Sequence, residues 1–236
     1  MGLSIYAAMQ NALQGVASAL LPRDCLLCGA AAGDRLLCDE CAAGLPRLPA
    51  HVCLVCALPT AGGEACGGCL KRQPHFDATL ACFVYAFPVD KLVQQLKFAH
   101  RLAIADFFSA ALIARGLPAA DLIVPVPLSP LRLRSRGFNQ ALEIARGLGR
   151  QCGVAVDKAS CRRTLETPPQ SALPWKERQK NVRGAFECGG DLAGKTILVT
   201  DDVMTTGATL DELARVLKDH GAAHVINCVA ARAMKA

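Results

Sequence analysis

The sequence feature that most constrains the fold is a repeated cysteine pattern between residues 25 and 69. Eight of the thirteen cysteines lie there, in two copies of the spacing C-x2-C-x9-C-x2-C that are offset by 28 residues. Two cysteines separated by two residues can hold an ion from one tight turn, and two such turns complete the tetrahedral thiolate site that suits zinc. The pattern therefore predicts two zinc sites. The predicted ligands are Cys25, Cys28, Cys38, Cys41, Cys53, Cys56, Cys66 and Cys69.

The predicted zinc sites are structural, because four protein sulfurs leave no coordination position open for water. Few large apolar residues lie between the cysteines, so metal binding would supply the folding free energy, on the order of 10 kcal/mol per site. Two alternatives stay open, an iron–sulfur cluster and a module that has lost one metal. The cysteine pairs could combine within each copy or across the copies, and their equal spacing favours pairing within each copy.

The rest of the composition indicates a folded chain with a large core. Hydrophobic residues make up 52% of the 236 residues, which excludes global disorder, and no apolar run is long enough to predict a transmembrane segment. Residues 1–21 lack the positively charged start of a secretory signal, and their apolar positions follow helical spacing, so we expect an amphipathic helix there. We therefore expect a cytoplasmic protein, in which clustered thiols bind metal rather than form disulfides. Small buried side chains are the expected role of the five isolated cysteines, Cys82, Cys152, Cys161, Cys188 and Cys228.

Positive charge is concentrated in residues 132–183, which contain twelve Lys and Arg but only four Asp and Glu. The whole chain carries a formal charge of +6, so the remainder is slightly acidic. Such a stretch predicts an anionic partner, either nucleic acid or a small polyphosphate, although a solvated helix surface is the alternative. It contains few aromatic residues, so no base-stacking platform is evident. Residues 1–75 have five basic and five acidic residues and become acidic with zinc thiolates, which argues against the zinc module alone as a nucleic-acid surface.

The carboxy-terminal part has the pattern of a strand, a loop, a helix and a second strand. Residues 196–200 form a short apolar run typical of a buried parallel strand, and residues 210–219 and 224–230 predict the helix and the next strand. Asp201 and Asp202 follow the first strand, at the edge of the sheet where α/β proteins bind ligands. In the loop at 205–209, Gly207 allows close backbone approach, and threonine hydroxyls and helix amides can donate to phosphate. An acidic turn with a threonine helix cap is the alternative.

A second glycine-rich motif, at residues 189–196, matches the P-loop pattern G-x4-G-K-[ST]. A working P-loop follows a strand and opens a helix. Here the lysine and threonine open the strand at 196–200, so we expect no P-loop.

Residues 197–209, ILVTDDVMTTGAT, resemble the phosphoribosyl diphosphate (PRPP) signature of type I phosphoribosyltransferases. Residues 124–128 (VPVPL) and 136–140 (RGFNQ) resemble the ComF/GntX family, whose members also begin with a cysteine-rich zinc segment. Further matching positions are Arg132, Thr167, Gln170, Leu173, Arg178, Asn181, Ala185 and Phe186. The resemblance implies a type I phosphoribosyltransferase-like α/β fold, with a parallel sheet flanked by helices after a small double zinc-ribbon module that has four cysteines at each site. It places the double zinc ribbon at 22–75 and the phosphoribosyltransferase-like domain at 76–236, after the helix that the apolar spacing predicts at 1–21.

The resemblance also implies a site for PRPP with Mg²⁺, or for another phosphorylated ribose. Asp201 and Asp202 would hold the ribose hydroxyls, Arg132 and Arg136 would contact the diphosphate, and residues 167–181 would form a mobile hood. Asp201, Asp202 and Arg136 are the expected catalytic residues. The remaining PRPP-binding positions would be Val203, Met204, Thr205, Thr206, Gly207, Ala208 and Thr209.

Two functional hypotheses follow, and they do not exclude each other. The first is phosphoribosyl transfer to an unknown acceptor, with turnover left open. Thr205 stands where purine enzymes of this type carry an aspartate, and threonine is a poor base, which puts hypoxanthine or guanine salvage in doubt. The second is a competence factor that binds single-stranded DNA, works with the DNA-uptake machinery and uses the PRPP site as a sensor. A structural interaction protein would not need the aspartate pair. Lys97, His100 and Arg101 are interpreted as solvated surface residues.

Overall fold

The computed structural model describes residues 23–165 and 182–234. The chain divides into two compact units, Met1–Leu45 and Pro46–Ala236. The first cysteine cluster belongs to the first unit, and the second cluster belongs to the same unit as the sheet. The predicted helix at 1–21 and the predicted hood at 167–181 lie outside the described residues.

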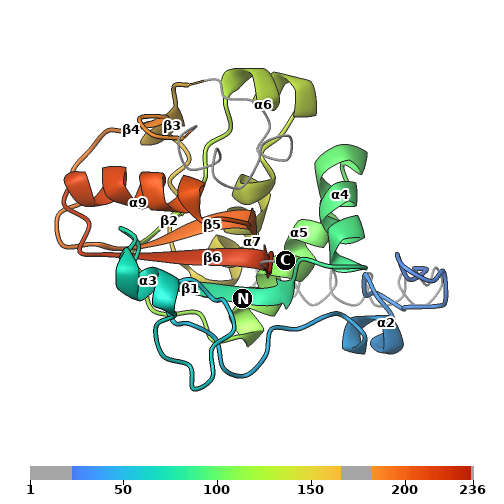
Figure 1. Ribbon diagram of the computed structural model, residues 1–236. Coiled ribbons are helices and arrows are strands. Elements are labelled where there is room, and N and C mark those ends of the chain that lie inside the picture. Colours follow the sequence, from blue (N-terminus) through green and yellow to red (C-terminus); the bar gives the residue numbers. More distant parts are fainter. Residues whose placement is uncertain (1–22, 166–181, 235–236) are drawn as a thin grey trace, which may run out of the picture. The chain divides into compact units, whose positions relative to one another are not determined.

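The second unit is built on a four-stranded parallel sheet in the order β1-β6-β5-β2 (Figure 1). The strands are β1 (Ala78–Val84), β6 (His224–Arg232), β5 (Thr196–Met204) and β2 (Leu122–Pro125). The central strands, β6 and β5, are mostly apolar and buried, as expected for a parallel sheet that helices cover on both faces. The predicted parallel sheet is confirmed. β5 is longer than the predicted strand at 196–200, so Asp201 and Asp202 lie within it rather than after it.

Helices cover both faces of this sheet. Alternate residues of β5 point to opposite faces, and Ile197 and Val199 pack in one apolar cluster with the buried side of α9 (Ala208–Asp219). On the other face, the Thr200 hydroxyl donates to the Ala141 carbonyl of α7 (Gln140–Cys152) at 3.1 Å. The other helices in the described residues of this unit are α3 (Gly67–Lys71), α4 (Val89–Ala99), α5 (Ala103–Ala114) and α6 (Pro130–Arg136).

The predicted helix at 210–219 is confirmed, and its apolar positions are all buried. The helix begins two residues earlier than predicted, because Gly207 at φ 83° serves as its N-cap. No P-loop forms, since residues 189–195 make a turn that leads into β5 rather than into a helix. Within residues 23–165 and 182–234, no helix combines the length and apolar composition that a bilayer crossing requires.

A short antiparallel hairpin joins β3 (Cys161–Arg163) to β4 (Phe186–Cys188). Cys161 and Cys188 face each other in this hairpin, and Cys188 is only partly buried. Cys82, Cys161 and Cys228 are buried as predicted, whereas Cys152 is exposed, so the buried interpretation of Cys152 is wrong. Cys152 is the last residue of α7, and it lies on the exposed side of the helix end.

Candidate functional site

The two cysteine clusters each form within one sequence repeat. In each cluster, the four Sγ atoms lie within 4.8 Å of one another. The Sγ atoms of Cys28 and Cys38 are 3.8 Å apart, and those of Cys56 and Cys66 are 3.5 Å apart. A zinc–sulfur bond of about 2.3 Å in tetrahedral geometry places two ligand sulfurs about 3.8 Å apart. The residues present therefore fit zinc, and the ligand pairs combine within each repeat.

The two clusters share their local backbone structure. In the first knuckle the amide of Gly29 donates to the Cys25 carbonyl at 2.9 Å, and in the second Ala57 donates to the Cys53 carbonyl at 2.8 Å. Cys38 and Cys66 occupy the N-cap positions of α2 (Asp39–Ala43) and α3. Burial raises the pKa of Cys25, but backbone N–H donors outweigh it and lower the pKa to about 6. Because zinc binds thiolates, these donors prepare the cluster for the metal.

The aspartates at the end of β5 are not equivalent, because neighbouring strand residues point to opposite faces. Asp202 is 2% exposed. One of its carboxylate oxygens accepts from the Gln140 amide at 2.9 Å, and the other forms an ion pair with Lys97 of α4. Burial alone would raise the pKa of Asp202, but the attraction of Lys97 outweighs it, so the pKa lies below its usual range. Asp202 is therefore buried, and both of its carboxylate oxygens contact protein side chains, Gln140 and Lys97.

Asp201 is half-buried, and its Oδ1 accepts the backbone N–H of Asp202 at 2.8 Å. Burial and the adjacent charge of Asp202 raise the pKa of Asp201 well above its usual value. Asp201 is thus the member of the pair without a cation bonded to its carboxylate among the described contacts.

Arg136 reaches the aspartates through Gln140. Its guanidinium donates to Gln140 Oε1 at 2.5 Å and stacks over the ring of Phe98, 5.5 Å from the ring centre. Burial lowers the pKa of Arg136, against the attraction of Asp202. Arg132 lies one turn earlier on α6, where its backbone N–H donates to the capping hydroxyl of Ser129. Arg136, Gln140 and Lys97 thus surround Asp202, and the surface interpretation of Lys97 is wrong.

The loop after β5 ends at the N-terminus of α9. Gly207 adopts the left-handed conformation that favours glycine, and a Cβ there would lie 2.7 Å from the Met204 Cε atom. The Thr206 hydroxyl accepts from the amide of Ala208 at 3.2 Å. The first turn of a helix has N–H groups without intrahelical acceptors and a positive dipole end, which together attract anions. This end of α9 can therefore bind phosphate.

Arg232, the last residue of β6, forms hydrogen bonds with the backbone of this loop. The side chain is 2% exposed. Its guanidinium donates to the carbonyls of Cys56 at 2.7 Å, Met204 at 3.0 Å and Ala233 at 2.7 Å, and also to that of Thr205. Arg232 therefore joins a ligand of the second cysteine cluster to the loop. Only the presence of a charged residue at the end of an apolar strand could have indicated this role from the sequence.

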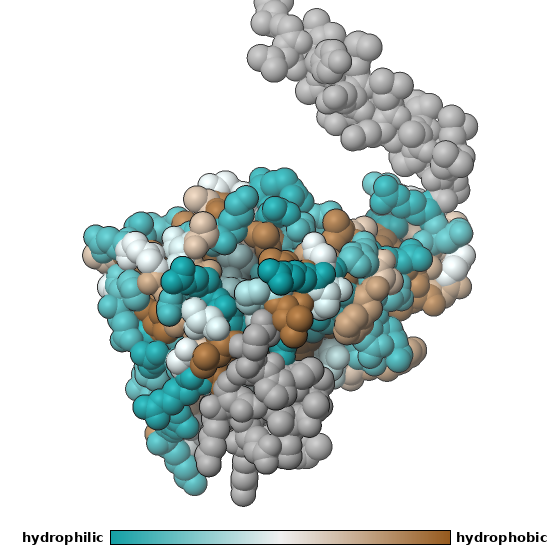
Figure 2. All heavy atoms as spheres, turned by 90° about the horizontal axis from the view of Figure 1, so that it is seen from above, coloured by the Kyte–Doolittle hydropathy of each residue, from teal (hydrophilic) through white to brown (hydrophobic). Residues whose placement is uncertain are grey.

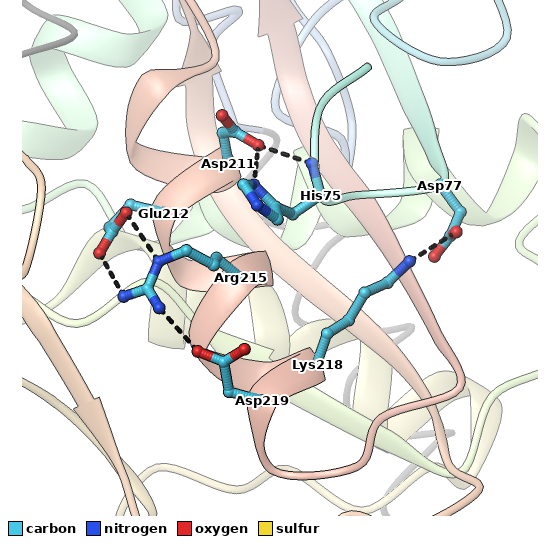
Figure 3. Close-up of polar contacts among 7 residues, drawn as sticks. All are labelled: His75, Asp77, Asp211, Glu212, Arg215, Lys218 and Asp219. Atoms are coloured by element: carbon cyan, nitrogen blue, oxygen red, sulfur yellow. Dashed lines mark hydrogen bonds and ion pairs between the residues drawn. The ribbon is translucent and has the colours of Figure 1, made fainter. Parts of the chain in front are cut away.

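Polar contacts also fix α9 against the segment that precedes β1 (Figure 3). Asp211 accepts from the backbone N–H of His75 at 2.7 Å and contacts its ring at 2.9 Å, while Lys218 pairs with Asp77 at 2.8 Å. On the exposed side of the helix, Arg215 pairs with Glu212 and Asp219. Asp211, the acidic residue of the first turn, therefore has partners of its own, and two side chains of α9 hold the helix against the segment before β1.

A cavity of about 740 Å³ lies beside the loop, within the second unit. Asp201 and Asp202 are not part of its wall. Its lining includes Cys66, Gly207, Arg72, Arg183, Arg215 and Arg232. The N-terminal end of α9 and the second cysteine cluster thus line one arginine-rich space.

In the described parts of the basic stretch, 132–165 and 182–183, the arginines lie in different environments. Arg146, Arg150 and Arg162 pair with acidic residues, at 2.6–2.7 Å. Arg163 is buried and stacks over Phe186. Arg136 of α6, by contrast, lies near the aspartate pair, because it contacts Gln140, which contacts Asp202. In Figure 2, hydrophilic and hydrophobic residues are interspersed over the visible face.

Comparisons with known proteins agree with these features. Residues 16–70 match the double zinc ribbon domain family, and residues 133–236 match the phosphoribosyl transferase domain family. The chain is 34% identical over 210 residues to the DNA utilization protein YhgH of Escherichia coli K12, covering 85% of this chain and 86% of that protein. It is 29% identical over 169 residues to competence protein F of Haemophilus influenzae, covering 67% and 74% of the two chains.

This chain belongs to the ComF/GntX family. A further ComF-family relative is competence protein ComFC of Bacillus subtilis, which is 27% identical over 205 residues, covering 80% of this chain and 81% of that protein. Among solved structures, the chain resembles a glutamine PRPP amidotransferase from B. subtilis complexed with ADP and GMP, at a TM-score of 0.37 and 19% identity. That likeness covers 53% of this chain and 26% of the other. The two family matches show that the chain contains a double zinc ribbon and a phosphoribosyltransferase domain, and the structure groups four cysteines at each of two sites.

Proposed function

We propose that this ComF-family protein binds PRPP with Mg²⁺ at the carboxyl edge of its sheet. The observation that carries the proposal is the position of Asp201 near the end of β5, three residues before the last residue of the strand, where the chain passes through a glycine-containing loop into α9. The 5′-phosphate would accept hydrogen bonds from the loop and from the first turn of α9. The ribose hydroxyls would donate hydrogen bonds to Asp201. Lys97 and Gln140 hold the side chain of the neighbouring Asp202 in place.

The residues present also suit a magnesium complex of the sugar diphosphate. Mg²⁺ prefers oxygen ligands and is usually bound by one or two carboxylates together with substrate phosphates, and Asp201 is a half-buried carboxylate at the proposed ribose position. When bound, Mg²⁺ would neutralise charge on the diphosphate. Arg132 and Arg136 would hold the same group from α6. These residues supply positive charge where negative charge develops as the bond between the sugar and the diphosphate breaks.

We propose that phosphoribosyl transfer follows binding, with an acceptor that is not a purine salvage base. Thr205 offers no carboxylate to take a proton from an incoming base. The acceptor would displace the diphosphate from the ribose carbon, and its proton would pass to solvent or to the departing diphosphate. Mass spectrometry after incubation with PRPP, Mg²⁺ and a metabolite extract tests this step. A new phosphoribosylated compound supports transfer, and slow release of ribose 5-phosphate alone contradicts it.

Binding itself is tested by calorimetric titration with PRPP and Mg²⁺. We expect the wild-type protein to bind, and Asp201→Asn to bind at least tenfold more weakly, because the amide accepts hydroxyl donors less strongly than a carboxylate. Asp106→Asn is the matched control, since Asp106 is an exposed aspartate of α5 that pairs with Arg150. Equal affinity for the wild type and Asp201→Asn would reject this site.

A second proposal is a role in the uptake of single-stranded DNA from the cytoplasmic side. Two relatives are named competence proteins, and Arg134 is exposed on α6, next to Arg132. Phosphate contacts make affinity fall with salt, in proportion to the number of phosphates neutralised. We expect single-strand binding that weakens as salt rises, and a smaller salt slope in Arg134→Ala. Competition by PRPP would link the DNA to the sugar site, and binding that does not change with salt would reject this role.

A further inference from the structure

The hairpin of β3 and β4 places two cysteines directly opposite each other. Cys161 and Cys188 are register partners, and their Sγ atoms are 2.6 Å apart. The backbone hydrogen bonds from Gly189 to Ser160 and from Thr164 to Ala185 place the ladder bonds at the even-numbered residues of β3. Cys161 and Cys188 therefore form a non-hydrogen-bonded pair, whose Cα atoms in antiparallel strands are about 4.5 Å apart. That separation lies within the range that a disulfide bridges without backbone movement.

The two thiols differ in their access to solvent. Cys161 is 7% exposed, whereas Cys188 is partly exposed and lines a cavity of about 440 Å³. The pair belongs to neither zinc cluster, because each cluster already has four cysteines of its own. An oxidant in solution can thus reach Cys188 directly, and Cys161 can react only through its partner.

We propose that Cys161 and Cys188 form a reversible disulfide when the protein meets a small disulfide such as oxidised glutathione. The Cys188 thiolate attacks one sulfur of the small disulfide and releases the first small thiol, which takes up the proton. Cys161 then attacks the Cys188 sulfur, forms the protein disulfide and releases the second small thiol with its proton. Two protein thiols are oxidised, and one small disulfide is reduced to two thiols.

The environment of Cys161 and Cys188 favours the disulfide between these two residues, but it makes the reaction slow. Burial raises the pKa of both thiols, so each is mostly protonated at neutral pH. The exposed Cys152 has no nearby thiol partner among the described contacts, so it can form only a mixed disulfide. We expect Cys152 to acquire glutathione first, and the Cys161–Cys188 bridge to form afterwards.

The bridge would fix the hairpin beside α9. β4 contacts α9, and the amide of Gly184, just before β4, donates to Glu212 of α9 at 2.8 Å. The bridge closes a loop between residues that are 27 apart in the sequence. Closing such a loop raises the melting temperature of a domain of this size by on the order of 10 °C.

The test uses the zinc-loaded full chain treated with oxidised glutathione. Free thiols are then alkylated, and the digested peptides are mapped by mass spectrometry. We expect a linked Cys161–Cys188 peptide that disappears with dithiothreitol, and a melting temperature that falls on reduction. In Cys161→Ser, which removes only the buried partner, we expect glutathione to remain on Cys188.

Three results would overturn the proposal. Both thiols could stay alkylatable while Cys152 carries glutathione. The zinc-ligand cysteines could cross-link while the hairpin pair stays reduced. Cys188 could fail to retain glutathione in Cys161→Ser. Cys152→Ser is the matched control, and it should leave the linked peptide and the melting shift unchanged.

Discussion

Replacing Arg232 by methionine should separate the second zinc site from the loop that it supports. Methionine keeps much of the apolar stem but provides no donor for the carbonyls of Cys56, Met204 and Thr205. A buried carbonyl without a donor costs about 1–3 kcal/mol, although removing a desolvated charge offsets part of that loss. Burial lowers the pKa of Arg232, because the charged guanidinium loses its hydration. We therefore expect a net loss of about 3 kcal/mol in the free energy of unfolding.

For a chain of this size, that loss corresponds to a melting temperature lower by about 6–12 °C. Thermal unfolding of the zinc-loaded protein measures it, and a chromogenic chelator follows zinc release. We expect one zinc to leave faster than in the wild type and the other to be unchanged, since the first cluster belongs to a separate compact unit. Arg215→Met is the control, because its ion pairs on α9 are partly exposed and contribute little. Melting within about 2 °C of the wild type, with unchanged release of both zinc ions, would refute this role.

Three further predictions follow from the site. Lys97→Met should destabilise the protein by about 3 kcal/mol at neutral pH. The lowered pKa of Asp202 contributes stability above its unfolded value of 3.8, so this difference should shrink as urea unfolding is repeated toward pH 3; a constant difference would contradict the pairing. Gly207→Ala should lose about 1 kcal/mol of stability and weaken PRPP binding, because alanine is strained at φ 83°; unchanged titrations would contradict the assigned loop conformation. Elemental analysis of gently purified protein should give about two zinc per chain, and a value near zero would reject both sites.

The parts of the fold that could be predicted depend on residues close in sequence. The spacing of Cys25, Cys28, Cys38 and Cys41 predicts a four-cysteine zinc site and favours a ligand set within one repeat, and the structure groups the sulfurs in that way. The apolar run of β5 and the helical periodicity of α9 likewise give the strand and helix beside the proposed site. The pairing of the cysteines, left open by spacing alone, required the structure.

The parts that could not be predicted depend on contacts between residues far apart in sequence. Gln140 and Asp202 are 62 residues apart, and Arg232 is 176 residues from Cys56. No local pattern marks such partners. The basic stretch at 132–183 is a further example. Arg150 pairs with Asp106 on α5, so the net positive charge around Arg150 is smaller than the composition of the stretch indicated. The proposed role of Asp201 in ligand binding and the domain boundaries at 22–75 and 76–236 stay predictions.

The central claim is that a phosphorylated ribose binds where β5 meets α9. Amide NMR spectra of the isotope-labelled, zinc-loaded protein, recorded while PRPP and Mg²⁺ are added, test it most directly. We predict saturable shifts in the amides of Asp201 and of residues 205–209, and smaller shifts at the same amides with ribose 5-phosphate. Saturable shifts confined to other parts of the chain, or spectra that do not change at millimolar ligand, would contradict it.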